Sequence, residues 1–140
     1  MIDFTSKFGR VVKRHLNEEY FVWLTTVGSD LTPQPRPVWF IWDKDSFLIF
    51  SQAKAYKLKH ISQHPKVAMH FNAGDERADE GVIVIIGEAF IDQSAPPAHK
   101  LPAYLKKYKT GIAGLGNTPE EFSREYSVAI RVTPTSLRGW

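Results

Sequence analysis

Apolar residues follow two different periods along this chain. Between residues 4 and 18 they recur every three to four positions, which predicts an amphipathic helix. After residue 19 the period shortens to two, and short runs rich in β-branched and aromatic residues predict strands. The predicted strands cover residues 20–27, 34–42, 47–51, 67–71, 82–91, 126–133 and 136–140.

Turn and cap residues separate these strands. Gly28-Ser29-Asp30 predicts one turn, and Asp43-Lys44-Asp45-Ser46 predicts a hairpin between the second and third strands. A short basic helix should follow the third strand and end near His64, because Pro65 disfavours helical geometry in the residue before it. The polar run over residues 72–81 predicts an exposed loop.

Two more helices are predicted in the second half of the chain. One covers residues 98–115, after the double proline at 96–97. The other begins at Pro119, where Thr118 and Glu121 have the spacing of a capping box. Pro134 should separate the last two strands.

Three strand features carry further information. Pro35 and Pro37 cannot donate to a strand ladder, so their strand should start at an edge, at a bulge or beside a ligand. Residues 82–91 are almost wholly apolar, as expected for a strand buried on both faces, and Gly87 within them suggests a bulge or bend. The two-residue period places alternate side chains of 36–42 on opposite faces: Arg36, Val38, Phe40 and Trp42 on one, and Trp39 and Ile41 on the other.

Six or seven strands with few helices predict a mainly β fold, a small antiparallel barrel with flanking helices. The 140 residues fit a single domain, 1–140, and 43% hydrophobic content supports an ordered core. Cysteine is absent, which excludes disulfides and thiolate metal sites. The start of the chain lacks a secretory pattern and no apolar run is long enough to span a bilayer, so we expect a soluble cytoplasmic protein.

The formal charge of +3 is mild, but basic residues gather at 54–66 and 100–109. The first cluster follows a strand end, and the first turn of the next helix is expected to carry Ser51, Lys54, Tyr56 and Lys57. Arg36, Ser51, Lys54, Tyr56 and Lys57 would there bring cationic and hydroxyl groups to free backbone amides, a setting that favours an anion such as a cofactor phosphate. Ser51 could both cap this helix and donate to the phosphate, and Lys54 and Lys57, three residues apart, would face the same side of its first turns. A capped helix with solvated lysines is the alternative, and spacing alone does not separate the two. For the second cluster a solvated helix face is the preferred interpretation.

No catalytic nucleophile motif and no glycine-rich phosphate loop is present, so no catalytic residue is assigned. His60 and His64 are four residues apart on a predicted helix, but a third metal ligand is missing from the pattern. We therefore expect no metal site.

The order of several short motifs resembles the flavin-binding split-barrel family of pyridoxamine 5′-phosphate oxidase-like proteins. The matching runs are Arg36 to Phe40, Phe50-Ser51-Gln52, Lys57-Leu58 and His64 to Val67. The segments 102–108 and 126–140 further resemble a short subgroup of oxidoreductases that use the deazaflavin coenzyme F-420.

This resemblance implies a split β-barrel homodimer with two cofactors at the subunit interface, and neither nucleic acid nor membrane as a partner. Carried over by position, Arg36 and Lys57 would grip the cofactor phosphate and Ser51 would hydrogen-bond to it. Val38, Trp39 and Phe50 would lie along the ring and ribityl chain. The backbone of the strand that includes Pro37 would meet the pyrimidine edge, with Lys54 and Tyr56 nearby.

Three departures from the family pattern bear on the reaction. Tyr56 stands where a second arginine is common, and Val82 stands where pyridoxamine oxidases have a glutamine that contacts the ring. The C-terminal motif with arginine and histidine is absent as well. Oxidation of pyridoxamine phosphate is therefore not the expected activity.

The resemblance implies an oxidoreductase that transfers a hydride between a bound cofactor and a small conjugated acceptor. The deazaflavin is favoured and FMN is the alternative, since both carry a ribityl phosphate and a tricyclic ring. In such proteins the cofactor supplies the redox chemistry, while the chain holds and orients it. A second hypothesis is a carrier that binds a flavin or a haem-like ligand without turnover. A third and weaker one is nucleic-acid binding through Trp39, Trp42 and the basic helix.

Overall fold

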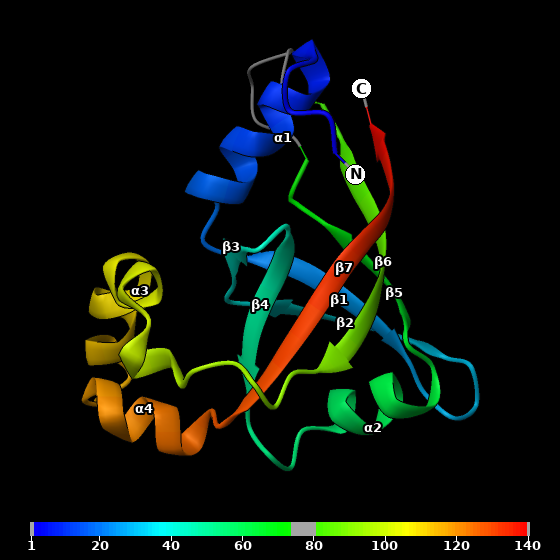
Figure 1. The fold of residues 1–140 in the computed structure, drawn as a ribbon. Coiled ribbons are helices and arrows are strands. Elements are labelled where there is room, and N and C mark those ends of the chain that lie inside the picture. The colour runs from blue at the N-terminus through cyan, green and yellow to red at the C-terminus, as the bar shows by residue number, and fades with distance from the viewer. Residues whose placement is uncertain (1, 74–80, 140) are drawn as a thin grey trace.

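A single antiparallel sheet of seven strands organises the chain in the computed structural model, which describes residues 2–73 and 81–139 (Figure 1). The strand order is β2-β1-β5-β6-β7-β4-β3. This confirms the predicted mainly β class, with the sheet curled as in a split barrel. The strands are β1 (Val22–Val27), β2 (Pro33–Val38), β3 (Ile41–Asp43), β4 (Ser46–Ser51), β5 (Lys66–His70), β6 (Ile83–Ile91) and β7 (Val128–Gly139).

Helices occupy the ends and one side of this sheet. They are α1 (Lys7–Glu18), α2 (Tyr56–Gln63), the 3₁₀ turn η1 (Ala98–Lys100), α3 (Pro102–Gly114) and α4 (Pro119–Glu125). The predicted capping box is present, because Thr118 and Glu121 each accept a backbone hydrogen bond from the other. The predicted helix 98–115 is divided into η1 and α3 at Leu101, which has extended backbone angles. Within the described ranges no helix is both long and apolar enough to cross a membrane.

The predicted single strand 34–42 is wrong, since it forms two strands at opposite edges of the sheet. β2 pairs with β1, whereas β3 pairs with β4, and only Trp39 and Phe40 separate them. The sheet must therefore curl until its two edges meet at these two residues. The prolines of β2 lie on an edge strand, as predicted.

The β3–β4 hairpin has the turn that the sequence predicts. Lys44 and Asp45 have φ of 53° and 57°, and Asp43 pairs with Ser46 across them. Two consecutive positive φ values match the type I′ turn, whose twist suits the flanking strands.

The two predicted strands at the end of the chain form one continuous strand, β7, that runs through Pro134. The register with β6 shifts between Ile86 and Gly87, so that Ile86 pairs with Ser136 while Gly87 pairs with Pro134. Thr135 is the extra residue, and this bulge accommodates a proline that has no N–H to donate. A Cβ at Gly87 would lie 2.7 Å from the Thr133 carbonyl oxygen, which explains the glycine.

β6 is not buried on both faces, contrary to the prediction. Its buried residues alternate with exposed ones, and Ile86 is 37% and Phe90 49% exposed. The apolar run therefore supplies one face to the core and leaves the other uncovered in the single chain.

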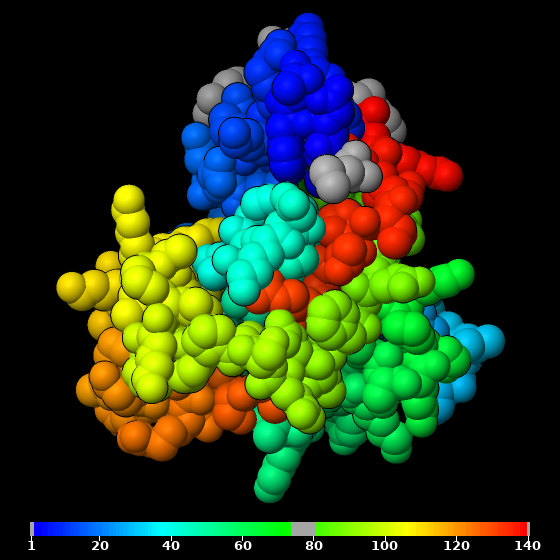
Figure 2. All heavy atoms as spheres, viewed as in Figure 1, coloured from blue at the N-terminus to red at the C-terminus, as the bar shows by residue number. Residues whose placement is uncertain are grey.

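Two hydrophobic clusters hold the fold together. The larger one fills the curl of the sheet and includes Leu16 of α1 and Ile61 of α2. The smaller one lies on the outside of β3, β4 and β7, under α3 and α4. In the space-filling view, α3 and α4 (yellow and orange) form a lobe beside the β3–β4 hairpin in cyan (Figure 2). This lobe makes one wall of the site described below.

Candidate functional site

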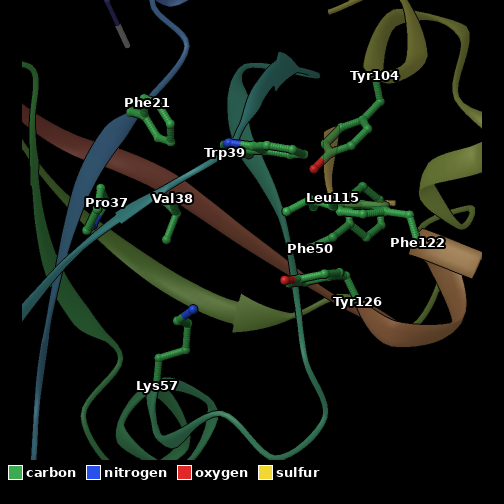
Figure 3. A pocket seen from close by; sticks show the side chains of 10 residues that line it. All are labelled: Phe21, Pro37, Val38, Trp39, Phe50, Lys57, Tyr104, Leu115, Phe122 and Tyr126. Carbon is green, nitrogen blue, oxygen red and sulfur yellow. The ribbon is translucent and has the colours of Figure 1, made fainter. Parts of the chain in front are cut away.

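Two cavities meet where β2 approaches α2. The first, of about 280 Å³, has aromatic and aliphatic walls (Figure 3). The second, of about 600 Å³, has more polar and charged residues in its lining and is bounded by β1, β2 and α2. Pro37 and Lys57 line both cavities, so a long ligand with an apolar and a polar end could extend from one into the other.

The aromatic cavity combines residues from β2, β4, α2 and the α3–α4 lobe. Val38 and Trp39 come from the end of β2 and its continuation, and Phe50 comes from β4. The remaining residues that line it are Phe21, Pro37, Lys57, Tyr104, Leu115, Phe122 and Tyr126. Its flat ring surfaces suit a planar ligand.

Trp39 is held between two other rings. It stacks on Tyr108 with centroids 4.6 Å apart and planes 10° apart, and on Phe122 with centroids 5.7 Å apart. Both partners belong to the α3–α4 lobe. The indole therefore has a defined orientation at the edge of the cavity, although it lies in the break between two strands.

The polar cavity contains the two cations predicted to bind a phosphate. Arg36 lines it from β2 and Lys57 from the first turn of α2. Burial lowers the pKa of Lys57, and the charge of Arg36 lowers this pKa further. An anion bound between these two like charges would relieve their repulsion. The remaining lining residues are Thr26, Gln34, Pro37, Ala55, Tyr56 and His60.

The structure does not bring every predicted site residue to the cavities. Tyr56 lines the polar cavity but is 82% exposed. Lys54 precedes α2 and lines neither cavity. Ser51 also lines neither, is 1% exposed, and its hydroxyl donates to the Gln52 carbonyl.

The expectation that Ser51 caps the helix is therefore wrong. The N-cap of α2 is Ala55, which has no side-chain cap. Lys54 and Lys57 do not share a helical turn either, because Lys54 lies before the start of the helix. Because the helix begins only at Tyr56, four residues separate Ser51 from its first turn.

Sequence reasoning missed the wall that the α3–α4 lobe contributes. Tyr104, Tyr108 and Ile112 recur every four residues, and all three are buried, so their period could have indicated a buried helix face. It could not have indicated which strands that face covers. Lys107 was also missed: its Nζ donates to the Phe40 carbonyl at 2.9 Å and lies 3.7 Å from the Phe40 ring centroid, so it is not part of a solvated face.

His60 has a protein partner in the polar cavity. Its Nδ1 lies 2.9 Å from the Thr26 hydroxyl, which is buried in β1. In the part of the chain that the structure describes, no group of three or more His, Cys, Asp or Glu side chains could hold a metal ion.

Comparison with known proteins matches residues 9–140 to the family model described as pyridoxamine 5′-phosphate oxidase. No curated protein gives a significant match.

Several solved structures have a similar fold. An F420 reductase is 25% identical, with a TM-score of 0.65, over 90% of this chain and 94% of that one. The conserved hypothetical protein Rv2991 of Mycobacterium tuberculosis is 17% identical, with a TM-score of 0.73, over 96% of this chain and 84% of that one. HutZ, the haem storage protein of Vibrio cholerae, is 12% identical, with a TM-score of 0.64, over 95% and 94% of the two chains.

Proposed function

This chain belongs to the pyridoxamine 5′-phosphate oxidase family, and on that premise we propose that it is an oxidoreductase that uses a deazaflavin coenzyme or FMN. The reaction would be hydride transfer between this cofactor and a small conjugated acceptor. The observation that carries the proposal is the position of Lys57, which lines both the aromatic and the polar cavity. A phosphorylated ring compound has the two chemically different ends that these cavities suit.

The phosphate end would lie in the polar cavity. Arg36 and Lys57 would bind it, and the half-buried position of Lys57 strengthens a charge-assisted hydrogen bond relative to one in water. Tyr56 would close the outer side of this cavity. Ser51 and Lys54 are less well placed to bind the phosphate, because neither lines the cavities.

The ring end would lie in the aromatic cavity along Val38, Trp39 and Phe50, with the β2 backbone at Pro37 beside it. The bound cofactor supplies the hydride chemistry. The chain would bind the tail, orient one ring face and exclude water, tasks that require no protein nucleophile. The deazaflavin remains the favoured cofactor, and the F420 reductase neighbour supports this choice.

We also propose that the protein is a homodimer. Cross-strand neighbours place Trp23 beside His70 and Val84, and Thr25 beside Ala68 and Ile86, on the sheet face that points away from the core. These side chains keep partial exposure and belong to neither core cluster. A second copy of the chain would cover this apolar face, which lies close to Phe21 and Pro37 of the aromatic cavity.

The second candidate is a carrier that binds a flavin or haem-like ligand without turnover. The similarity to the haem storage protein HutZ favours it at the level of fold. The residues that line the aromatic cavity include no histidine, the commonest protein ligand for haem iron, which favours the enzyme instead.

One experiment tests the proposal and separates the two candidates. The protein is titrated with FMN and with the oxidised deazaflavin, and binding is followed by absorbance and fluorescence. The reduced forms are then mixed with a panel of quinones and enones. Saturable binding with multiple turnovers supports the enzyme, binding without turnover supports the carrier, and absence of binding to either compound contradicts both.

A further inference from the structure

Tyr104 is a buried tyrosine whose hydroxyl borders the aromatic cavity. It lies in the first turn of α3, is 1% exposed, and packs edge-on against Phe50 with ring centroids 5.1 Å apart. Its hydroxyl makes no hydrogen bond to any residue in the ranges that the structure describes. Figure 3 shows the oxygen directed into the aromatic cavity. Because this hydroxyl has no partner among the described residues and opens to the cavity, a ligand in the cavity can hydrogen-bond with it.

The surroundings of Tyr104 keep its hydroxyl protonated. Burial raises its pKa, and the neighbouring Tyr108, Tyr126 and Tyr20 raise this pKa further. The hydroxyl therefore offers a donor hydrogen over the whole physiological pH range. A ligand atom with a lone pair and no hydrogen, such as a carbonyl oxygen, can therefore accept a hydrogen bond from it.

The position of Tyr104 in the cavity indicates whether it would contact the cofactor or the molecule that accepts the hydride. Figure 3 shows Tyr104 across the cavity from Lys57, the residue proposed to bind the cofactor phosphate. Tyr104 thus lies on the wall formed by the α3–α4 lobe, facing Trp39 and Phe50. A molecule bound on that side of the cofactor ring would be the substrate that accepts the hydride.

We propose that Tyr104 donates a hydrogen bond to a carbonyl oxygen of the acceptor, which makes the acceptor a planar quinone or enone. The assignment rests on the proposed oxidoreductase function. The rings of Trp39, Phe50 and Phe122 supply flat apolar walls for such a molecule, and Tyr104 supplies a polar contact that orients it.

The step balances for an enone. A bound reduced deazaflavin or flavin would supply a hydride, and thus two electrons, by losing one of its own C–H or N–H bonds and becoming oxidised, and a new C–H bond would form on the conjugated carbon of the enone. The C=C electron pair moves to give an enolate, and the negative charge on its oxygen is stabilised by the Tyr104 hydroxyl. A proton from water then completes the saturated ketone. Tyr104 keeps its proton throughout.

Two ligands and two proteins test this assignment. Menadione and 2-methylnaphthalene have the same fused-ring shape, but only menadione has carbonyl oxygens. Each is equilibrated by dialysis with the wild type and with Tyr104→Phe, both with saturating FMN and without cofactor. The chain has no cysteine, so the quinone forms no thiol adducts. A neutral hydrogen bond predicts that Tyr104→Phe weakens menadione binding roughly 3- to 10-fold and leaves 2-methylnaphthalene binding unchanged.

The carbonyl stretching frequency of bound menadione gives a second readout. It should be lower in the wild type than in Tyr104→Phe, because a hydrogen bond weakens the C=O bond. A merely structural role for the hydroxyl would leave this difference at zero. Thermal unfolding of both proteins confirms that each is folded.

Three results would overturn the assignment. The first is an equal loss of both ligands, which indicates a change of cavity shape. The second is menadione binding that the substitution does not change. The third is a loss of FMN affinity in Tyr104→Phe, which places the hydroxyl on the cofactor. If FMN and the deazaflavin fail to bind the wild type, the proposed function fails by itself, and the menadione data on the cofactor-free protein still decide the role of Tyr104.

Discussion

The Tyr108 hydroxyl accepts a hydrogen bond from the Phe40 backbone N–H at 2.8 Å, at the point where the two edges of the sheet meet. The same hydroxyl faces the carbonyl oxygens of Tyr20 and Phe40 at 2.8 and 2.9 Å. A helix side chain thus provides the hydrogen bond that a neighbouring strand would provide elsewhere in the sheet. It also fixes the backbone between β2 and β3, and with it Trp39 at the wall of the aromatic cavity.

Tyr108→Phe should lower the free energy of unfolding by about 1–3 kcal/mol, because it leaves the buried Phe40 N–H without a partner. Urea unfolding followed by circular dichroism measures the effect. Tyr104→Phe is the matched control, since it removes a buried hydroxyl from the same helix that makes no hydrogen bond within the described residues. Equal effects of the two substitutions would contradict the bridging role of Tyr108.

Lys57→Ala should weaken binding of FMN or the deazaflavin by about 1.5–3 kcal/mol, roughly 10- to 100-fold, because it removes a charged hydrogen bond to the phosphate. Lys59→Ala removes the same charge from an exposed position of α2 that lines neither cavity, and should leave affinity nearly unchanged. Fluorescence titration of both variants checks this. Equal affinities would place the phosphate away from Lys57.

Cofactor affinity should fall as the pH rises. The fall should begin at a lower pH than the one at which an exposed lysine loses its proton. Burial and Arg36 lower the pKa of Lys57, so the free protein loses this proton earlier than an exposed lysine would, and a neutral amine attracts a phosphate poorly. Arg36→Gln removes the repulsion, which raises the pKa of Lys57 and moves the decline to higher pH. Riboflavin, which lacks the phosphate, should show a flatter profile than FMN. Identical profiles for the two ligands would exclude Lys57 as the titrating group.

Lys107 should make stability depend on pH in the mildly alkaline range. Burial lowers its pKa to about 8 from the unfolded value of 10.5, although Glu19 partly opposes this shift. Between these values the unfolded chain binds more protons than the folded one, so wild-type stability gains with rising pH. Lys107→Met removes this contribution. The free energies of unfolding of both proteins are measured at about pH 7, 8 and 9. The wild-type value minus the Lys107→Met value should increase as the pH rises. A difference that does not change with pH would contradict the prediction.

Ile86→Asp should shift the proposed dimer towards the monomer, because it places a charge in the centre of the uncovered sheet face. Ile86 is 37% exposed in the single chain, so the substitution should leave the fold intact. Sedimentation velocity compares the variant with the wild type over a range of concentrations. Lys13→Glu, an exposed charge change on α1, serves as the control. A wild type that is monomeric at all concentrations would refute the dimer.

Features that depend on neighbouring residues could be predicted from the sequence. The capping box of Thr118 and Glu121 and the hairpin over residues 43–46 formed as expected. In each of these cases backbone sterics or a hydrogen bond a few residues away decides the conformation.

Features that depend on distant segments could not be predicted in the same way. Pro134 interrupts a strand in isolation, but the bulge opposite Gly87 lets β7 continue through it. Residues 34–42 have an unbroken strand pattern, but they divide because Trp39 and Phe40 connect opposite edges of the sheet. Ser51 was expected to cap α2, but the helix starts only after Ala55.

By itself the sequence determined the class of fold, the edge position of β2 and the two cations that share the polar cavity, because period, proline chemistry and charge are properties of the residues themselves. Only the tertiary structure decided that Tyr104, Phe122 and Tyr126 form the opposite wall and that Lys107 is half-buried against Phe40. These residues lie more than fifty positions from Trp39, Phe40 and Phe50, and packing across such a separation leaves no period or spacing in the chain.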